Sequence, residues 1–167
     1  MTVTSSVQVE ADAYRIARDA NPLCCELSAA VAVCVHDDTQ GVGGLLHLRF
    51  VPSSHSKPAD LTDNTLSSDL LLLDRFCKDL RSQGARKQSW RVHLIGHIPA
   101  TAGMETPAAT LLDLLRAYFA DGRLPVECNA LHRANSVIVN FVPREGTMRL
   151  QANGEPAGPD AKKVGVV

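Results

Sequence analysis

Apolar positions along this chain follow two different periods, and their succession predicts strands mixed with helices. Residues 27–35 form the longest strongly apolar run without a charge, and its side chains are mostly small or β-branched. Periodicity alone leaves open whether so short a run is a buried strand or a buried helix. Six further segments have the alternation or composition typical of strands: residues 3–11, 45–50, 91–98, 125–131, 136–143 and 147–151.

Two segments instead have the spacing of amphipathic helices. Leu66–Gln83 carries apolar residues three and four positions apart, and Gly84 is well placed to end that helix. Pro107–Ala120 has the same character, with Thr106 as the expected N-cap and Gly122 just past the end.

This order of elements predicts an α+β, or layered α/β, fold. We expect a single compact domain of mixed strands packed with two main helices over residues 1–151. Residues 152–167 contain Gly, Pro and Lys with little that could pack, so we expect a flexible C-terminal tail.

Composition narrows the function classes. A net charge of −1 without a basic stripe disfavours nucleic acid as a partner. The first ten residues lack an apolar leader, and the longest apolar run is about nine residues against the roughly 20 that a bilayer requires. We therefore expect a cytoplasmic protein without membrane insertion. Five cysteines without a regular framework indicate reduced thiols, and no metal-site signature or cofactor motif predicts a bound group.

The apolar run belongs to a longer pattern. Residues 27–38 combine it with a polar turn, and residues 41–47 add a glycine-rich segment that ends in His47. This layout resembles the opening of the chemoreceptor glutamine deamidases, the CheD family, which reads Leu-Gly-Ser-Cys-Val-Ala-Val, an acidic turn, Gly-Gly and then His. Segments 91–97, 103–106, 123–126 and 144–150 resemble later family motifs in the same order. The resemblance covers about residues 20–151.

The resemblance implies roles for particular positions. Ala30 stands at the position of the nucleophilic cysteine, and His47 stands at that of its base. Cys24 occupies the place of a threonine that assists catalysis. The remaining positions that the resemblance assigns to substrate binding are Ser28, Ala29, Gly96 and His97, of which His97 replaces the second glycine of a Gly-Gly pair.

Deamidation of a glutamine attacks an unreactive amide, which calls for a thiolate activated by an imidazole. Because Ala30 has no nucleophilic atom, the first hypothesis is a pseudo-enzyme that binds the cytoplasmic helices of methyl-accepting chemoreceptors or a CheC-type phosphatase. The second is an active glutamine deamidase, an amide hydrolase, that uses Cys24 or Cys25 with His47. Taken alone, His47 also suits an ordinary strand histidine.

Three other histidines have less specific interpretations. His36 precedes two aspartates and is expected at a turn. His93 and His97 lie in a predicted strand, where residues four apart point to the same face.

Overall fold

A fully buried central strand organises the structure. The computed structural model describes residues 6–50, 65–99, 105–124, 126–132 and 136–152. In it the apolar run becomes the strand β4 (Ala30–Asp37), and each of its 8 residues is buried. The strand alternative is therefore the correct one for this run. β4 pairs antiparallel with β5 (Val42–Arg49) on one side and with β6 (Trp90–His97) on the other.

The described strands form two sheets. One has five strands in the order β2-β5-β4-β6-β7, with β7 parallel to β6, and the other has four in the order β1-β3-β8-β9. The bounds of the remaining strands are β1 Val7–Gln8, β2 Ala13–Ala17, β3 Leu23–Leu27, β7 Val126–His132, β8 Val137–Val142 and β9 Thr147–Ala152.

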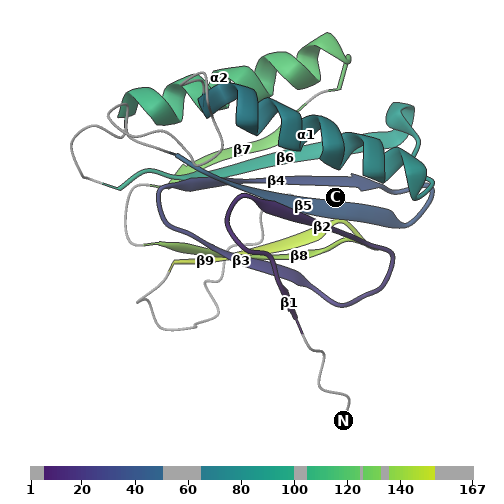
Figure 1. The fold of residues 1–167 in the computed structure, drawn as a ribbon. Coiled ribbons are helices and arrows are strands. Elements are labelled where there is room, and N and C mark those ends of the chain that lie inside the picture. The colour runs from purple at the N-terminus through teal and green to yellow at the C-terminus, as the bar shows by residue number, and fades with distance from the viewer. Residues whose placement is uncertain (1–5, 51–64, 100–104, 125, 133–135, 153–167) are drawn as a thin grey trace.

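The elements stack in three layers (Figure 1). Helices α1 (Thr65–Ser82) and α2 (Glu105–Asp121) cover one face of the five-stranded sheet, and the four-stranded sheet lies against its other face. A short 3-10 helix, Lys87–Ser89, leads into β6. This is a mixed α+β fold in a single compact domain, as the sequence predicts.

Two apolar cores result, one on each face of the five-stranded sheet. Along β4 the valines at 31, 33 and 35 join the core under the helices, while Ala30, Ala32 and Cys34 join the core between the sheets. Because side chains alternate along a strand and both faces are covered, β4 must be apolar at almost every position.

Several sequence predictions need correction. Strands β2 and β3 were not predicted, and the strand expected at 45–50 begins earlier, at Val42. The proposed N-cap Thr106 is wrong, because α2 already begins at Glu105 and Thr106 lies inside it. Of the predicted tail, only Ala152, which ends β9, falls within the described residues.

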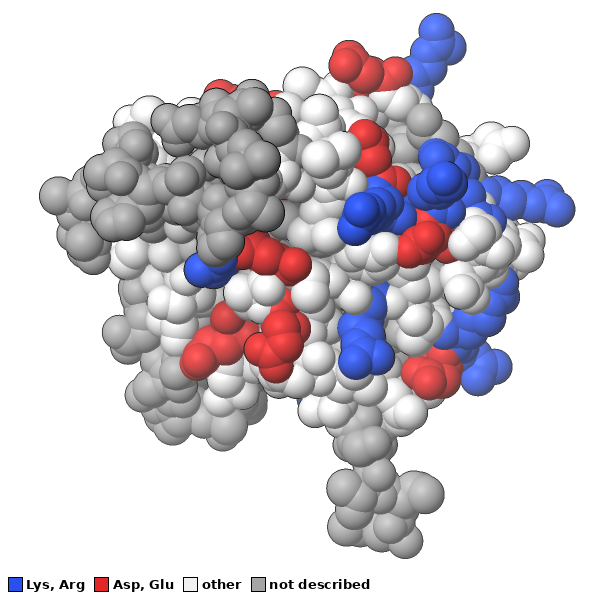
Figure 2. Space-filling view, viewed as in Figure 1, with Lys and Arg blue, Asp and Glu red and all other residues white. Residues whose placement is uncertain are grey.

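The outer surface carries both signs of charge. Figure 2 shows acidic and basic side chains interspersed over the face seen in Figure 1. Neither helix of the described chain has the length and apolarity that crossing a bilayer requires.

Both helices end in a left-handed residue. Gly84 ends α1 with φ 102°, as predicted, and Ala85 N–H donates to the carbonyl of Leu80 at 3.0 Å. Gly122 follows α2, but the left-handed position falls on Arg123 with φ 58°. Leu124 N–H then donates to the carbonyl of Phe119 at 2.8 Å, which completes the same type of cap.

We expect Arg123→Gly to raise the free energy of unfolding by about 0.5–1 kcal/mol, because glycine adopts this conformation without steric cost. Urea unfolding measures the change. Gly84→Ala is the matched control and should lower stability, since the φ of Gly84 is 102°, a conformation that residues with a Cβ rarely adopt. A destabilised Arg123→Gly protein would contradict this account of the α2 cap.

Candidate functional site

The register of the central strands brings Ala30, His47 and His97 to one end of the five-stranded sheet. Ala30 lies opposite His97 on β6 and opposite Arg49 on β5, and His47 lies two pairs further along, opposite Ala32. Paired residues, and residues two apart, share a face of a sheet. Ala30, His47 and His97 therefore share the face that meets the second sheet, and all three are buried.

His47 is held by the segment before β2. Its Nδ1 lies 3.2 Å from the carbonyl oxygen of Val9. A carbonyl can only accept, so Nδ1 carries the proton and Nε2 keeps its lone pair. Burial lowers the pKa of the ring, although the bond to Val9 opposes that shift. The result is a neutral imidazole in the tautomer that a base acting through Nε2 requires.

Asp12 braces the strand that carries His47. Its backbone N–H donates to the carbonyl of His47 at 2.7 Å, and its carboxylate forms an ion pair with Arg49 at 2.6 Å. Asp12 adopts φ 57°, a conformation that an aspartate in a turn tolerates better than most residues. The loop thus ties Arg49, which lies opposite Ala30, to the backbone of the candidate base.

His97 takes the opposite tautomer. Its Nδ1 accepts the backbone N–H of Ala29 at 3.1 Å, so the ring proton lies on Nε2. Ala29 itself adopts φ 52°, and its carbonyl accepts Phe50 N–H at 2.8 Å. The turn just before β4 is therefore fastened to both neighbouring strands. The exposed Ser28 belongs to the same turn, while Gly96 lies opposite Val31, in register with the helix-covered face.

The two candidate cysteines lie on the other sheet, and on opposite faces of β3. Leu23, Cys25 and Leu27 face the core between the sheets, so Cys24 faces away from it. Burial raises the pKa of Cys25 to about 12, with a smaller contribution from Cys24. Burial also raises the pKa of Cys24, and Glu26 adds to that rise. Both sulfurs are therefore protonated thiols near neutral pH.

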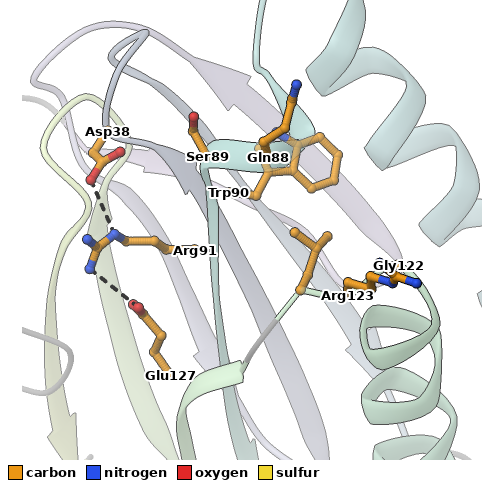
Figure 3. A pocket seen from close by; sticks show the side chains of 9 residues that line it. Asp38, Gln88, Ser89, Trp90, Arg91, Gly122, Arg123 and Glu127 are labelled. Carbon is orange, nitrogen blue, oxygen red and sulfur yellow. Dashed lines mark hydrogen bonds and ion pairs between the residues drawn. The ribbon is translucent and has the colours of Figure 1, made fainter.

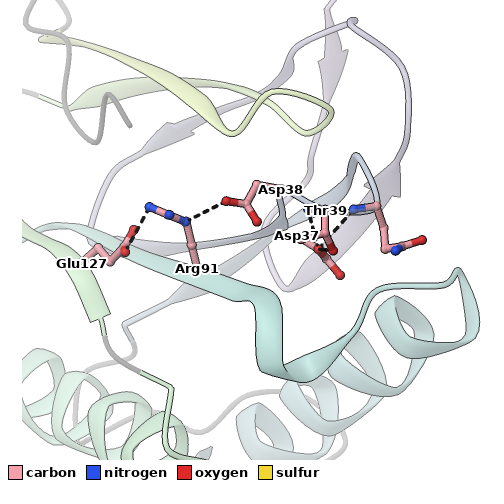
Figure 4. Close-up of polar contacts among 6 residues, drawn as sticks. Asp37, Asp38, Thr39, Arg91 and Glu127 are labelled. Atoms are coloured by element: carbon pink, nitrogen blue, oxygen red, sulfur yellow. Dashed lines mark hydrogen bonds and ion pairs between the residues drawn. The ribbon is translucent and has the colours of Figure 1, made fainter.

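A second polar cluster lies at the opposite end of β4, and the sequence had indicated only a turn there. Arg91 Nε contacts Asp38 at 3.2 Å, and its Nη1 contacts Glu127 at 3.3 Å (Figure 4). Beside this triad Trp90 and Arg123 line an open cavity of about 700 Å³ (Figure 3). The described residues contain no group of three or more His, Cys, Asp or Glu side chains that could hold a metal ion.

Comparison with known proteins finds distant relatives that are named for an activity. No protein-family model matches the chain. It is 25% identical over 135 residues to the "probable chemoreceptor glutamine deamidase CheD" of Burkholderia orbicola, covering 77% of this chain and 54% of that protein. The CheD of Burkholderia vietnamiensis gives the same figures, and CheD 1 of Burkholderia thailandensis is 24% identical over 122 residues. The chain spans about half the length of these curated relatives.

We expect the His47 ring to titrate below its ordinary pKa of 6.5, because burial disfavours the charged form. The unfolded chain then takes up the proton first, so the stabilisation is complete above about pH 6.5 and is lost as the pH falls through the lower folded pKa. NMR titration of the ring, assigned with His47→Gln, measures this value. A pKa at or above 6.5 would show that the ring is more hydrated or more strongly paired than the structure indicates.

Proposed function

We propose that this protein is a CheD-like binding protein that recognises the cytoplasmic helices of methyl-accepting chemoreceptors without deamidating them. The observation that carries the proposal is the pair of side chains, His47 and Ala30, at one end of the five-stranded sheet. There the neutral imidazole of His47, whose Nε2 carries no proton, shares a face of the sheet with Ala30. The side chain of Ala30 has no atom capable of nucleophilic attack.

The comparisons support the kind of partner. The relatives are named as deamidases of chemoreceptors, and the similarity covers 72–77% of this chain. The segment that contains Ala30 and His47 is also the one whose layout resembles the CheD opening, and His97 lies in the later segment 91–97 that resembles another family motif. Chemoreceptor helices present glutamine and glutamate side chains, and such a protein would meet them in the cytoplasm.

The geometry around Ala29 supports loss of the chemistry. An acyl-transfer site needs backbone N–H groups directed at the developing oxyanion, next to the nucleophile. The Ala29 N–H immediately precedes the nucleophile position, and here it donates to His97 Nδ1 at 3.1 Å. The resemblance assigns a glycine to position 97, and a glycine has no side chain that could accept a hydrogen bond from the Ala29 N–H. His97 therefore engages the Ala29 N–H, which would otherwise be free to donate to the oxyanion.

The surroundings of the cysteines weigh against a relocated nucleophile. A thiol whose pKa is about 12, as for Cys25, holds a negligible thiolate fraction at neutral pH. Cys24 is less buried, but it lies on the face of β3 that points away from the sheet carrying His47. We therefore assign the retained function to binding.

A mass-spectrometric assay with a chemoreceptor cytoplasmic fragment tests the proposal. We expect measurable binding of the fragment but no gain of about one dalton, the mass change of Gln-to-Glu conversion. Cys24→Ala and Cys25→Ala are the matched controls. Conversion that disappears in one cysteine variant would overturn the proposal and identify the relocated nucleophile.

The two changes at the site can be separated by restoring them in turn. Ala30→Cys alone should give little deamidation, because His97 still holds the Ala29 N–H. Ala30→Cys combined with His97→Gly should be faster by roughly 10²-fold, the usual effect of one oxyanion donor. Adding His47→Gln to the double variant should abolish the gain. Equal rates for the single and double variants would show that His97 does not block the site.

The family resemblance also offers a CheC-type phosphatase as a partner. Such a phosphatase would occupy the same end of the sheet by mimicking the glutamine substrate. Competition between the phosphatase and the receptor fragment should therefore be mutual if both bind, and His47→Gln should weaken both complexes together. Simultaneous binding would place the phosphatase on a different surface.

A further inference from the structure

Two histidines are buried together between the sheets, and their rings form no hydrogen bonds within the described part of the chain. His36 and His93 are 1% and 0% exposed, and their ring centroids lie 6.1 Å apart with planes only 4° from parallel. Among the described residues, neither nitrogen of either ring has a hydrogen-bond partner. Each unpaired buried polar group costs about 1–3 kcal/mol, so the arrangement is unusual for a purely structural core.

His36 is enclosed by the backbone of one turn and of strand β5. A Cβ added to Gly146 would lie 2.3 Å from Nε2 of the ring, which means that this glycine packs directly against the imidazole. Gly43 on β5 approaches His36 Cβ in the same way, and Phe141 on β8 lies with its ring centroid 6.4 Å away. The turn between β8 and β9 therefore packs against His36, and this contact links the four-stranded sheet to the five-stranded sheet.

The charged groups around the pair already have partners. Asp37 accepts hydrogen bonds from Thr39, Gln40 and Arg86. Asp38 and Glu127 share Arg91, as Figure 4 shows. Arg144 and Glu145 in the turn are exposed, and Cys34, opposite His93, is a buried thiol. Each nearby carboxylate is thus already engaged by another group, and a protonated His36 would have to compete for it.

Both rings are therefore neutral at ordinary pH. Burial lowers the pKa of His36, and the neighbouring carboxylates oppose that shift only in part. Burial likewise lowers the pKa of His93, with His36 contributing to the decrease. A charged ring could gain hydrogen bonds here only by reaching water, and the turn at Gly146 packs directly against the ring.

We propose that His36 is a proton-operated latch, whose protonation releases the β8–β9 turn from the five-stranded sheet. The neutral ring packs against Gly146 and keeps the turn closed, and the charged ring is hydrated only when the turn lifts. His93 supplies the parallel ring against which neutral His36 packs. This inference concerns the end of β4 remote from Ala30, so it stands whether or not the proposed receptor binding holds.

Hydrogen exchange of the full chain tests the latch. The Gly146 N–H donates to the carbonyl of Val142 at 2.7 Å, so its exchange reports opening of the turn. If opening takes up one proton on a ring whose open-state pKa is the ordinary 6.5, the opening constant should rise about fivefold as the pH falls from about 6.5 to about 5.5, after correction for the intrinsic rate. The Gly84 N–H, which donates to Arg81 at the end of α1, is the internal reference and should show no such rise.

Variants identify the ring responsible. His36→Leu should remove the pH response of Gly146, and His47→Gln should leave it unchanged. NMR titration of the wild-type rings provides a second measurement should His36→Leu fail to fold, and His36 should titrate together with the change at Gly146. Equal protection of Gly146 at both pH values, a response that persists in His36→Leu, or one equivalent of a transition metal bound to the wild-type pair would overturn the proposal.

Discussion

The pairing of β4 with strands on both sides is the constraint on which the other features depend. All 8 of its residues are buried, and it forms ladders with β5 and β6 along its whole length. Because side chains alternate, a slip of one residue would send Ala30, Ala32 and Cys34 toward the helices and the valines between the sheets. The small residues leave room for the histidines of the neighbouring strands, so the register sets both the packing and the position of the site.

The two ends of β4 hold histidines in very different states. At the Ala30 end, His47 and His97 each use Nδ1, one as a donor to Val9 and the other as an acceptor from Ala29. At the Asp38 end, His36 and His93 have no hydrogen bonds on their rings among the described residues. The first arrangement fixes the ring tautomers by hydrogen bonds, whereas the second buries ring nitrogens at a cost in free energy.

The sequence predicts the elements better than it predicts their contacts. Both helices and the strands β5 and β6 follow from local periodicity and composition. Periodicity left β4 open between a strand and a helix, because a run that is buried on both faces is apolar at almost every position. Strand β2 was missed because its residues, Ala13–Ala17, mix polar and apolar positions at the edge of the sheet. The left-handed conformation of Arg123 was also not predicted, because glycine is the usual residue at this cap position and Gly122 precedes Arg123 directly.

For the candidate site, too, the sequence indicates the residues but not the contacts between them. The family resemblance alone selects Ala30, His47 and His97, and strand alternation predicts that His93 and His97 share a face. No sequence signal indicates that His97 accepts the Ala29 N–H, because that contact depends on the register of β4 with β6. The stacking of His36 on His93 likewise depends on pairing between segments far apart in the chain.

Chemical-shift mapping of the wild-type protein with a chemoreceptor cytoplasmic fragment tests the central claim most directly. The account predicts that the largest amide shifts occur at Ala29–Val31, at His47–Phe50 and at Gly96–Ile98, where β4, β5 and β6 meet at one end of the sheet. Shifts confined to the Asp38 end, or none at saturating fragment, would contradict a receptor-binding site built around Ala30.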